Sequence, residues 1–357
     1  MKNFLTILLL IIINTAYSQL QKVEKVIDSC VKKDNFNGSV LLAKNGNIEL
    51  LTYKGLSNRH YNINFSDETR SHIFSLTKTF TAVLIMQLYE KGKINLDTTI
   101  STYYPEYKGE AAKKATIRNL LTYSSGRFNK DISSPELIHQ AYDNTIWNLD
   151  DFIKTFLSEK LINKPGTKFE YNNGDYILLG KIIEKIYNKP FEEVLKEQIL
   201  IPLKMSSTGF LHHNDIIKNL DEGYTADESD PFALHMPTNT YIDNLYCAGA
   251  MYSTPKDLLI FDQAIFNHTL IKKTTLDTML TPYKELGETA FSFWVYPKEF
   301  GSVNTLFAER QGEGYGHSAN WVHLVDKDVS LIILSNTKDI KYLNKMREKV
   351  LTAYYGQ

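Results

Sequence analysis

Cysteines and charged tracts are scarce in this sequence, and their scarcity excludes several classes of protein. Its 357 residues contain two cysteines, Cys30 and Cys247, too few for a disulfide framework of the kind that staples small secreted domains. We expect both thiols to be unpaired and mostly buried, although a single disulfide between them stays open. No basic run stands out and the formal net charge is -1, which argues against a nucleic-acid partner.

Long apolar segments are scarce as well. Residues 4–13 form an apolar run behind Lys2, and small and polar residues follow at 14–19. A run of about ten residues is well short of the roughly twenty that span a bilayer, which disfavours a membrane anchor. A basic start, a short apolar run and a small-x-small end are typical of a secretory signal peptide. We therefore expect residues 1–18 to be a signal peptide cleaved after Ser18, and the mature chain to be periplasmic or secreted.

The remaining sequence is that of a globular protein, with 43% hydrophobic and 23% charged residues. Strand patterns lie near both ends of the chain. Asn45-Gly46, flanked by apolar runs, is the strongest short signal for a hairpin, and two further strands are indicated at 321–325 and 329–334. Helical patterns fill the middle, for example at 176–187 and 191–200.

This order of elements predicts an α/β (α+β) fold in which residues 19–357 form one domain. An antiparallel sheet is built from both chain ends, at about 19–96 and 245–357, and is flanked by helices. A mainly helical insertion occupies about 97–244. The loops at 125–148 and 212–246 are expected to wall the substrate pocket.

A serine three residues before a lysine is the pattern richest in chemistry. Residues at i and i+3 share one helix face, so a lysine whose pKa is lowered by burial can take the proton of the serine hydroxyl. The pattern occurs four times, at Ser29/Lys32, Ser75/Lys78, Ser253/Lys256 and Ser335/Lys338. Only Ser75 stands at the opening of a long apolar helix, predicted over 73–91, where free backbone N–H groups favour negative charge. Helix capping or core packing is the alternative explanation for this serine.

Other motifs accompany Ser75 in a recognisable order. They lie at 36–46, 73–82, 120–126, 165–180 (with Tyr171-Asn-Asn173), 248–258 and 316–319 (Gly-His-Ser-Ala). Together they resemble the serine β-lactamase and penicillin-binding-protein superfamily, for which Ser-x-x-Lys is a signature. The resemblance is greatest to the branch of class C β-lactamases, D-alanyl-D-alanine carboxypeptidases, D-aminopeptidases and related esterases. It implies a β-lactamase/transpeptidase-like fold.

The resemblance also implies roles for individual residues. Ser75 is expected to be the nucleophile, with Lys78 and Tyr171 transferring its proton. Tyr171 must then titrate below its usual pKa of about 10, which nearby cations promote. Asn173 is expected to accept a hydrogen bond from Lys78 and to donate one to a substrate carbonyl.

The third motif departs from the family pattern. No Lys-Thr-Gly occurs in the chain, and His317 is expected to replace its lysine as a substrate-orienting or electrostatic group. Ala319 stands where the family usually has glycine, and its methyl group is expected to narrow the floor of the cleft. By the same analogy, the oxyanion hole is formed by the backbone N–H groups of Ser75 and Asn320.

The sequence therefore predicts an exported serine hydrolase that cleaves an amide or ester bond through a Ser75 acyl-enzyme. A carboxypeptidase-, aminopeptidase- or esterase-like activity is favoured over an efficient β-lactamase because Lys-Thr-Gly is missing. No metal or cofactor is implied, and the expected partner is a small-molecule or peptide-like substrate, with no nucleic acid and no stable membrane span in the mature chain. The alternative is a catalytically weak or silent homologue that binds peptidoglycan fragments or a protein partner, which Ala319 favours.

Overall fold

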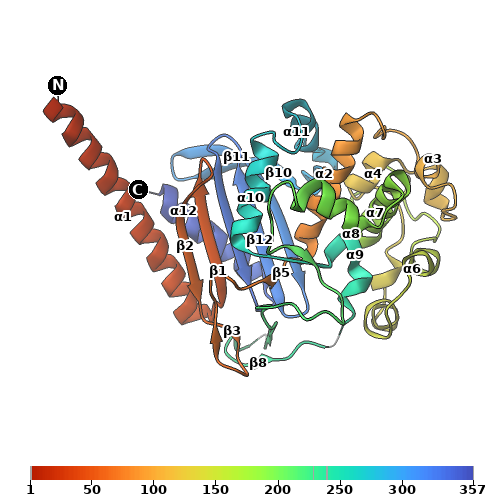
Figure 1. The fold of residues 1–357 in the computed structure, drawn as a ribbon, viewed down its shortest axis with the longest axis horizontal. Coiled ribbons are helices and arrows are strands. Elements are labelled where there is room, and N and C mark those ends of the chain that lie inside the picture. The colour runs from red at the N-terminus through yellow and green to blue at the C-terminus, as the bar shows by residue number, and fades with distance from the viewer. Residues whose placement is uncertain (1, 228, 239, 357) are drawn as a thin grey trace.

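The computed structural model describes residues 2–227, 229–238 and 240–356. Its centre is an antiparallel six-stranded sheet with the strand order β10-β11-β12-β13-β1-β2 (Figure 1). Its strands are β1 (Gly38–Lys44), β2 (Asn47–Lys54), β10 (Trp294–Phe300), β11 (Val303–Gly314), β12 (His317–Leu324) and β13 (Val329–Ser335). Because β1 pairs with β13 along its whole length, the sheet joins the two ends of the chain, as the sequence predicted.

The predicted hairpin at Asn45-Gly46 is confirmed. Both residues have positive φ, 50° for Asn45 and 72° for Gly46, as the tight turn between two right-twisted strands requires. Residues alternate between the two faces of the sheet, so Val40 and Leu42 enter one hydrophobic cluster and Leu41 and Ala43 the other.

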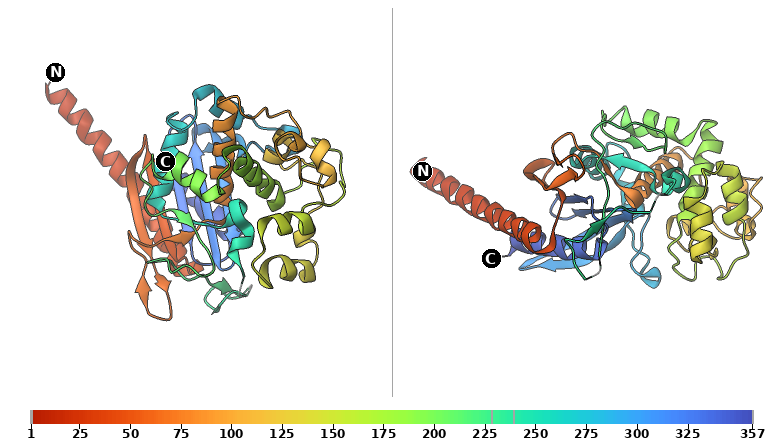
Figure 2. Two further views of the ribbon diagram at one scale, coloured as in Figure 1. Left: turned by 45° about the vertical axis from the view of Figure 1, so that its right-hand side comes forward. Right: turned by 90° about the horizontal axis from the view of Figure 1, so that it is seen from below.

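Helices cover both faces of the sheet. The terminal helices α1 (Lys2–Asp34) and α12 (Ile340–Tyr355) pack together on one face (Figure 2). Helices α2 (Thr77–Glu90) and α10 (Pro255–Phe266) lie on the opposite face. Cys30 and Cys247 are both free and buried, and they belong to the clusters on opposite faces. The prediction of unpaired thiols is therefore confirmed.

The predicted signal peptide falls on the first half of α1. The side chains of residues 1–17 lie outside the described part, so cleavage after Ser18 stays a prediction. Within the residues that the structure does describe, no helix is both long and apolar enough to span a bilayer.

The middle of the chain is mainly helical and forms the end of the molecule away from α1 (Figure 1). Its helices are α3 (Ile100–Tyr103), α4 (Ile117–Leu121), α5 (Pro135–Ile138), α6 (Leu149–Phe156), α7 (Asn173–Tyr187) and α8 (Phe191–Leu195), and α9 (Tyr246–Gly249) follows. Short strands β5 (Ser71–His72), β6 (Gly209–Phe210) and β9 (Met251–Ser253) form a small sheet beside them. Because α7 packs against both α2 and α9, the starts of these helices meet at one place.

The remaining elements connect these layers. They are β3 (Leu56–Asn58), β4 (Ile63–Asn64), β7 (Thr225–Ala226), β8 (Leu234–His235) and α11 (Lys273–Met279). The predicted helix over 73–91 does not start as an α-helix, because its first turn is the 3₁₀ turn η1 (Phe74–Leu76). The helix then runs as α2 and ends before Gly92, whose positive φ of 65° reverses the chain.

Candidate active site

Ser75 lies in η1, the turn that leads into α2. The residue before it, Phe74, has a φ of 42°, a left-handed conformation that is strained for a large side chain. Its ring packs against the ring of His72 with centroids 5.5 Å apart and against Gly314 of β11, where an added Cβ would lie 2.4 Å from the ring. Packing thus holds the strained turn in place, and Ser75 is partly exposed between the buried Phe74 and Leu76.

Lys78 lies one turn further along the helix and is completely buried. Its Nζ donates hydrogen bonds to Ser75 Oγ at 2.9 Å, Asn173 Oδ1 at 2.8 Å and the carbonyl of Ala248 at 2.7 Å. Three acceptors match the three donors of an ammonium group. Burial lowers the pKa of Lys78 to about 8, and Arg310 adds to this effect although Tyr171 opposes it.

Tyr171 contacts the same serine. Its Oη lies 2.6 Å from Ser75 Oγ and accepts a hydrogen bond from Arg310 Nη2 at 3.0 Å. Burial by itself would raise the pKa of Tyr171, but the charges of Lys78 and Arg310 outweigh it and lower the pKa to about 7. The two cations therefore favour the phenolate form of Tyr171.

Asn173 begins α7, directly after the residue that caps this helix. Its Oδ1 accepts from Lys78, as the sequence predicted, while the residue stays partly exposed. The segment 125–148, which was predicted as a loop and contains helix α5, contributes Asn129, whose side chain donates to the carbonyl of Tyr171 at 3.0 Å. The structure thus brings the predicted group of Ser75, Lys78, Tyr171 and Asn173 together.

Arg310 is a member of this cluster that sequence reasoning missed. It lies on β11 and is completely buried. Its Nε donates to the carbonyl of Ser75 at 2.8 Å, and its Nη1 donates to Tyr123 Oη at 2.9 Å and to the carbonyl of Ser292 at 3.1 Å. With the bond to Tyr171, the guanidinium links the turn that carries Ser75 to the tyrosine beside it.

Aromatic rings enclose the guanidinium of Arg310. Its Cζ lies 5.9 Å from the ring centroid of Tyr123, 5.7 Å from that of Tyr171 and 5.3 Å from that of Trp294. The rings of Tyr123 and Tyr171 stack at 4.8 Å. These negative ring faces help to hold a positive charge that is cut off from water.

The strand that borders Ser75 is β11. A Cβ on Gly312 would lie 2.3 Å from the carbonyl oxygen of Ile73 and 3.0 Å from the backbone nitrogen of Ser75. Arg310-Gln-Gly312 therefore places a cation and a glycine beside the nucleophile, in the same order as the Lys-Thr-Gly that the chain lacks. The sequence therefore does contain a counterpart of Lys-Thr-Gly. It lies on β11, one strand before the Gly-His-Ser-Ala motif that was predicted to fill this role.

The structure corrects the predictions for His317 and Asn320, because both lie on β12. The nitrogens of His317 face Asp221 Oδ1 at 2.9 Å and the carbonyl of Tyr315 at 3.2 Å, and its ring stacks on His72. Asn320 pairs with Gln311 of β11 and with a residue of β13 on its other side. Because β11 lies between Asn320 and Ser75, the backbone N–H of Asn320 cannot complete an oxyanion hole there.

Ala319 does not narrow an open cleft either. Its side chain is 0% exposed and belongs to the hydrophobic core. Its neighbours across the sheet are Gly312 and Leu334. The glycine that permits close approach to Ser75 is Gly312. Ala319, which was predicted to replace that glycine and to favour a weakened enzyme, lies elsewhere in the fold.

The edge of β11 is open beside the nucleophile. Strand β10 pairs with β11 from the turn, where Phe300 is opposite Val303, up to Trp294, which is opposite Glu309. Within the part of the chain that the structure describes, no other strand extends this pairing along 310–314. Backbone groups of this stretch therefore remain available on one side.

The turn between β11 and β12 determines which backbone N–H groups of β11 point to the open edge. Gly314 and His317 flank a two-residue turn, and residues in that position exchange hydrogen bonds with each other. The direction alternates along a strand, so Gly312 and Gly314 bond toward β12. The N–H groups of Gln311 and Glu313 consequently point to the open edge.

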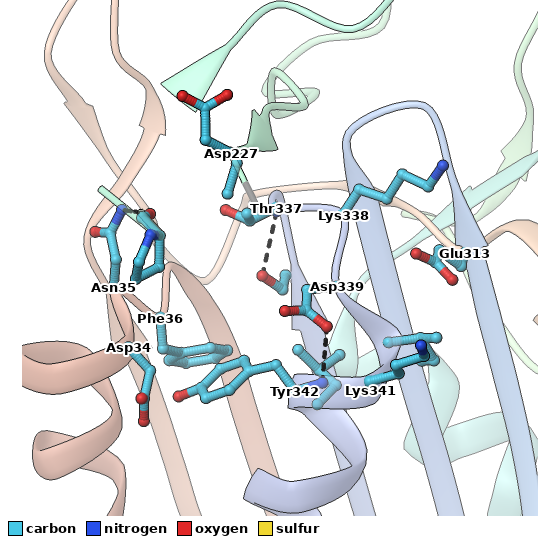
Figure 3. A pocket seen from close by; sticks show the side chains of 15 residues that line it. Asp34, Asn35, Phe36, Asp227, Glu313, Thr337, Lys338, Asp339, Lys341 and Tyr342 are labelled. Atoms are coloured by element: carbon cyan, nitrogen blue, oxygen red, sulfur yellow. Dashed lines mark hydrogen bonds between the residues drawn. The ribbon is translucent and has the colours of Figure 1, made fainter. Parts of the chain in front are cut away.

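Two cavities are lined by residues of η1 or β11. One of about 290 Å³ adjoins Phe74, and its other walls include Leu211, Met236 and Tyr315. A separate cavity of about 700 Å³ lies between the end of α1 and the start of α12 (Figure 3) and carries charges of both signs. Ser75 does not line this larger cavity. No cluster of three or more His, Cys, Asp or Glu side chains suited to a metal ion occurs among the described residues.

The arrangement has the parts that acyl transfer needs. A partly exposed hydroxyl contacts a tyrosine of lowered pKa and an ammonium group, and backbone N–H groups at the edge of β11 are free to face developing negative charge.

Several curated proteins resemble the chain. It is 28% identical over 282 residues to "Putative penicillin-binding protein PbpX" of Bacillus subtilis, covering 78% of this chain and 67% of that protein. It is also 28% identical over 301 residues to "Teichoic acid D-alanine hydrolase" of Staphylococcus aureus, covering 82% of this chain and 72% of the relative. Other Staphylococcus aureus relatives are longer, and the match spans 42% of their length.

Solved structures share the fold. The D-amino acid amidase of Ochrobactrum anthropi SV3 superposes with a TM-score of 0.77 to 0.79 in its several complexes, and its complex with D-phenylalanine covers 94% of this chain and 98% of the amidase at 21% identity. An identity this low establishes the fold alone. The family model described as "Beta-lactamase" matches residues 23–354, and we conclude that the chain belongs to the Beta-lactamase family of serine hydrolases, enzymes that act on amide or ester bonds.

Proposed function

We propose that the mature chain is an exported hydrolase that cleaves an amide or ester bond through an acyl-enzyme on Ser75. The observation that carries the proposal is the contact of Ser75 Oγ with both Tyr171 Oη at 2.6 Å and Lys78 Nζ at 2.9 Å. A serine that only capped a helix or packed in the core would need neither a tyrosine of lowered pKa nor a buried ammonium.

In the acylation step, Tyr171 acts as the general base. As a phenolate it accepts the proton of Ser75 while Oγ forms a bond to the substrate carbonyl carbon. Lys78 stabilises the phenolate and holds Ser75 in position through its own hydrogen bond. When the tetrahedral intermediate collapses, Tyr171 returns the proton to the departing amine or alkoxide.

The negative charge of the tetrahedral intermediate needs two donors. We assign these to the backbone N–H of Ser75 and to one of the N–H groups of Gln311 and Glu313 at the edge of β11. Water then attacks the acyl-enzyme and gives one proton to Tyr171, which passes this proton to Ser75 Oγ as the bond between Oγ and the acyl carbon breaks. The side chain of Asn173 is free to donate to a second carbonyl of the substrate.

Of the carboxypeptidase-, aminopeptidase- and esterase-like activities predicted from the sequence, the relatives support the aminopeptidase- and esterase-like ones. One matched relative is named for hydrolysing D-alanine from teichoic acid and one matched structure is a D-amino acid amidase. The cavity beside Phe74 offers apolar walls for part of the substrate, together with polar ones that include His212 and His213. The alternative of a silent homologue loses its main support, because Ala319 lies in the core.

A fluorophosphonate probe tests the proposal. We expect one covalent adduct per chain, assigned to Ser75 by peptide mass spectrometry, and its loss in Ser75→Ala. Ser29→Ala is the matched control, since Ser29 also precedes a lysine by three residues but sits within helix α1. A folded protein that forms no adduct would refute the proposed function and favour a binding protein.

A further inference from the structure

We propose that this active site selects substrates whose leaving group carries no carboxylate, so that uncharged esters and amides are preferred over peptides with a free C-terminus. The inference rests on the proposed role of Ser75. Recognition of a carboxylate in a partly dry cleft requires a cation or several hydrogen-bond donors directed at it. The two cations that contact the reacting groups are Lys78 and Arg310.

Lys78 has no donor left for a substrate. Its three N–H bonds are directed at Ser75, Asn173 and Ala248, all within 2.9 Å. The side chain is 0% exposed, so a substrate group cannot approach it without displacing one of these partners. Its charge therefore acts on the proton transfer and not on a distant part of the substrate.

Arg310 is also committed to the protein. Four of its five N–H bonds are directed at Ser75, Tyr123, Ser292 and Tyr171. The residue is 0% exposed, and aromatic rings pack around its guanidinium. A cation that bound substrate carboxylates at this position would need an exposed head group, which this arginine does not present.

The rest of the β11 edge adds no positive charge. Between Gln311 and Gly314 the one ionisable side chain is that of Glu313, which reaches into the separate cavity on the other face of the sheet (Figure 3). Its carboxylate brings no positive charge to this edge. A leaving group with a carboxylate that lies along this edge would thus lose water and meet no opposite charge from β11, whereas an amide or ester group carries no such penalty.

A pair of depsipeptides isolates this difference. N-acetyl-D-alanyl-D-lactate and its D-lactamide share the acyl group and the bond that is cleaved, and they differ only in whether the leaving group bears a carboxylate or a carboxamide. We would measure kcat/KM for both with the full mature chain and divide each value by the rate constant of the same ester with hydroxide. This division removes the intrinsic difference in leaving-group reactivity.

We expect the corrected kcat/KM to favour the lactamide by about tenfold or more. Equal values, or a preference for the lactate, would overturn the inference. Fluorophosphonate labelling of Ser75 in the same preparation separates the two claims: an adduct together with a preference for the lactate refutes the charge selectivity and leaves the serine hydrolase intact. Absence of the adduct refutes the proposed function and this inference with it.

Discussion

Replacing Arg310 by glutamine should move the pH dependence of catalysis to higher pH. The guanidinium lies 3.0 Å from Tyr171 Oη and is one of the two cations that lower the pKa of this tyrosine to about 7 against the opposing effect of burial. The proposed base is the phenolate, so kcat/KM of the wild type should rise with pH through about 7. Loss of the cation makes the phenolate harder to form.

The size of the shift follows from the distance. A unit charge at about 4 Å in a medium of effective dielectric constant about 20 contributes roughly 4 kcal/mol, or about three pKa units, and neighbouring opposite charges typically shift a pKa by about one to three units. About half of Tyr171 is ionised at pH 7 in the wild type, and this share should fall to roughly 10% to 0.1% in Arg310→Gln. We therefore expect a loss of about five- to 500-fold in kcat/KM at pH 7, with partial recovery near pH 9.

The assay is kcat/KM for p-nitrophenyl acetate between pH 5.5 and 9.5, with Ser75→Ala as the background. Arg310→Lys is the matched control, because it keeps a positive charge and should keep a midpoint near that of the wild type. Thermal melts and circular dichroism establish that each variant is folded. A midpoint is independent of how much protein is active, so partial misfolding cannot imitate the shift. If Arg310→Gln lowered kcat/KM equally at every pH with an unchanged midpoint, the electrostatic role of Arg310 and the assignment of Tyr171 as base would both be refuted.

Three further outcomes follow from the packing. Gly312→Ala should lower kcat by about a hundredfold or more, because the new methyl group pushes the β11 edge from the nucleophile; an active variant that melts like the wild type would contradict this. Ala319→Gly should leave kcat/KM unchanged and lower the free energy of unfolding by about 1 kcal/mol, and a gain in activity would restore the idea of a narrowed cleft. Cys30 and Cys247 are free and buried, so neither should react with a thiol reagent until the chain is unfolded, when both should be titrated.

Local signals in the sequence were sufficient for most of the fold. The turn at Asn45-Gly46 and the proline that opens α10 determine structure through their own backbone preferences. The strand β10 has no such signal, because Pro297 and its charged neighbours interrupt the alternation of apolar residues. An edge strand such as β10 tolerates proline at a position where no N–H is needed, and this context is visible only in the folded sheet.

The candidate site was predictable up to its third motif. Ser75 and Lys78 lie one turn apart, and Tyr171 and Asn173 come with a recognisable lead-in, so short-range patterns identified them. The choice of His317 failed because the motif was assigned to the strand after the tight turn and not to the strand before it. Which of two paired strands faces the nucleophile depends on the order of strands in the sheet, and that order is a property of tertiary structure.

The wide separation along the chain of the groups around Ser75 has a consequence for how the protein is made. The partners of η1 and α2 lie 96 residues away at Tyr171, 170 residues away at Ala248 and 235 residues away at Arg310. Contacts so distant in sequence form late in folding. While the protein is being synthesised, the hydroxyl is already present but lacks the tyrosine, the buried cation and the strand edge that would make it reactive. We therefore expect the proposed activity only after β11 has joined the sheet, and we expect a half-made chain not to be acylated.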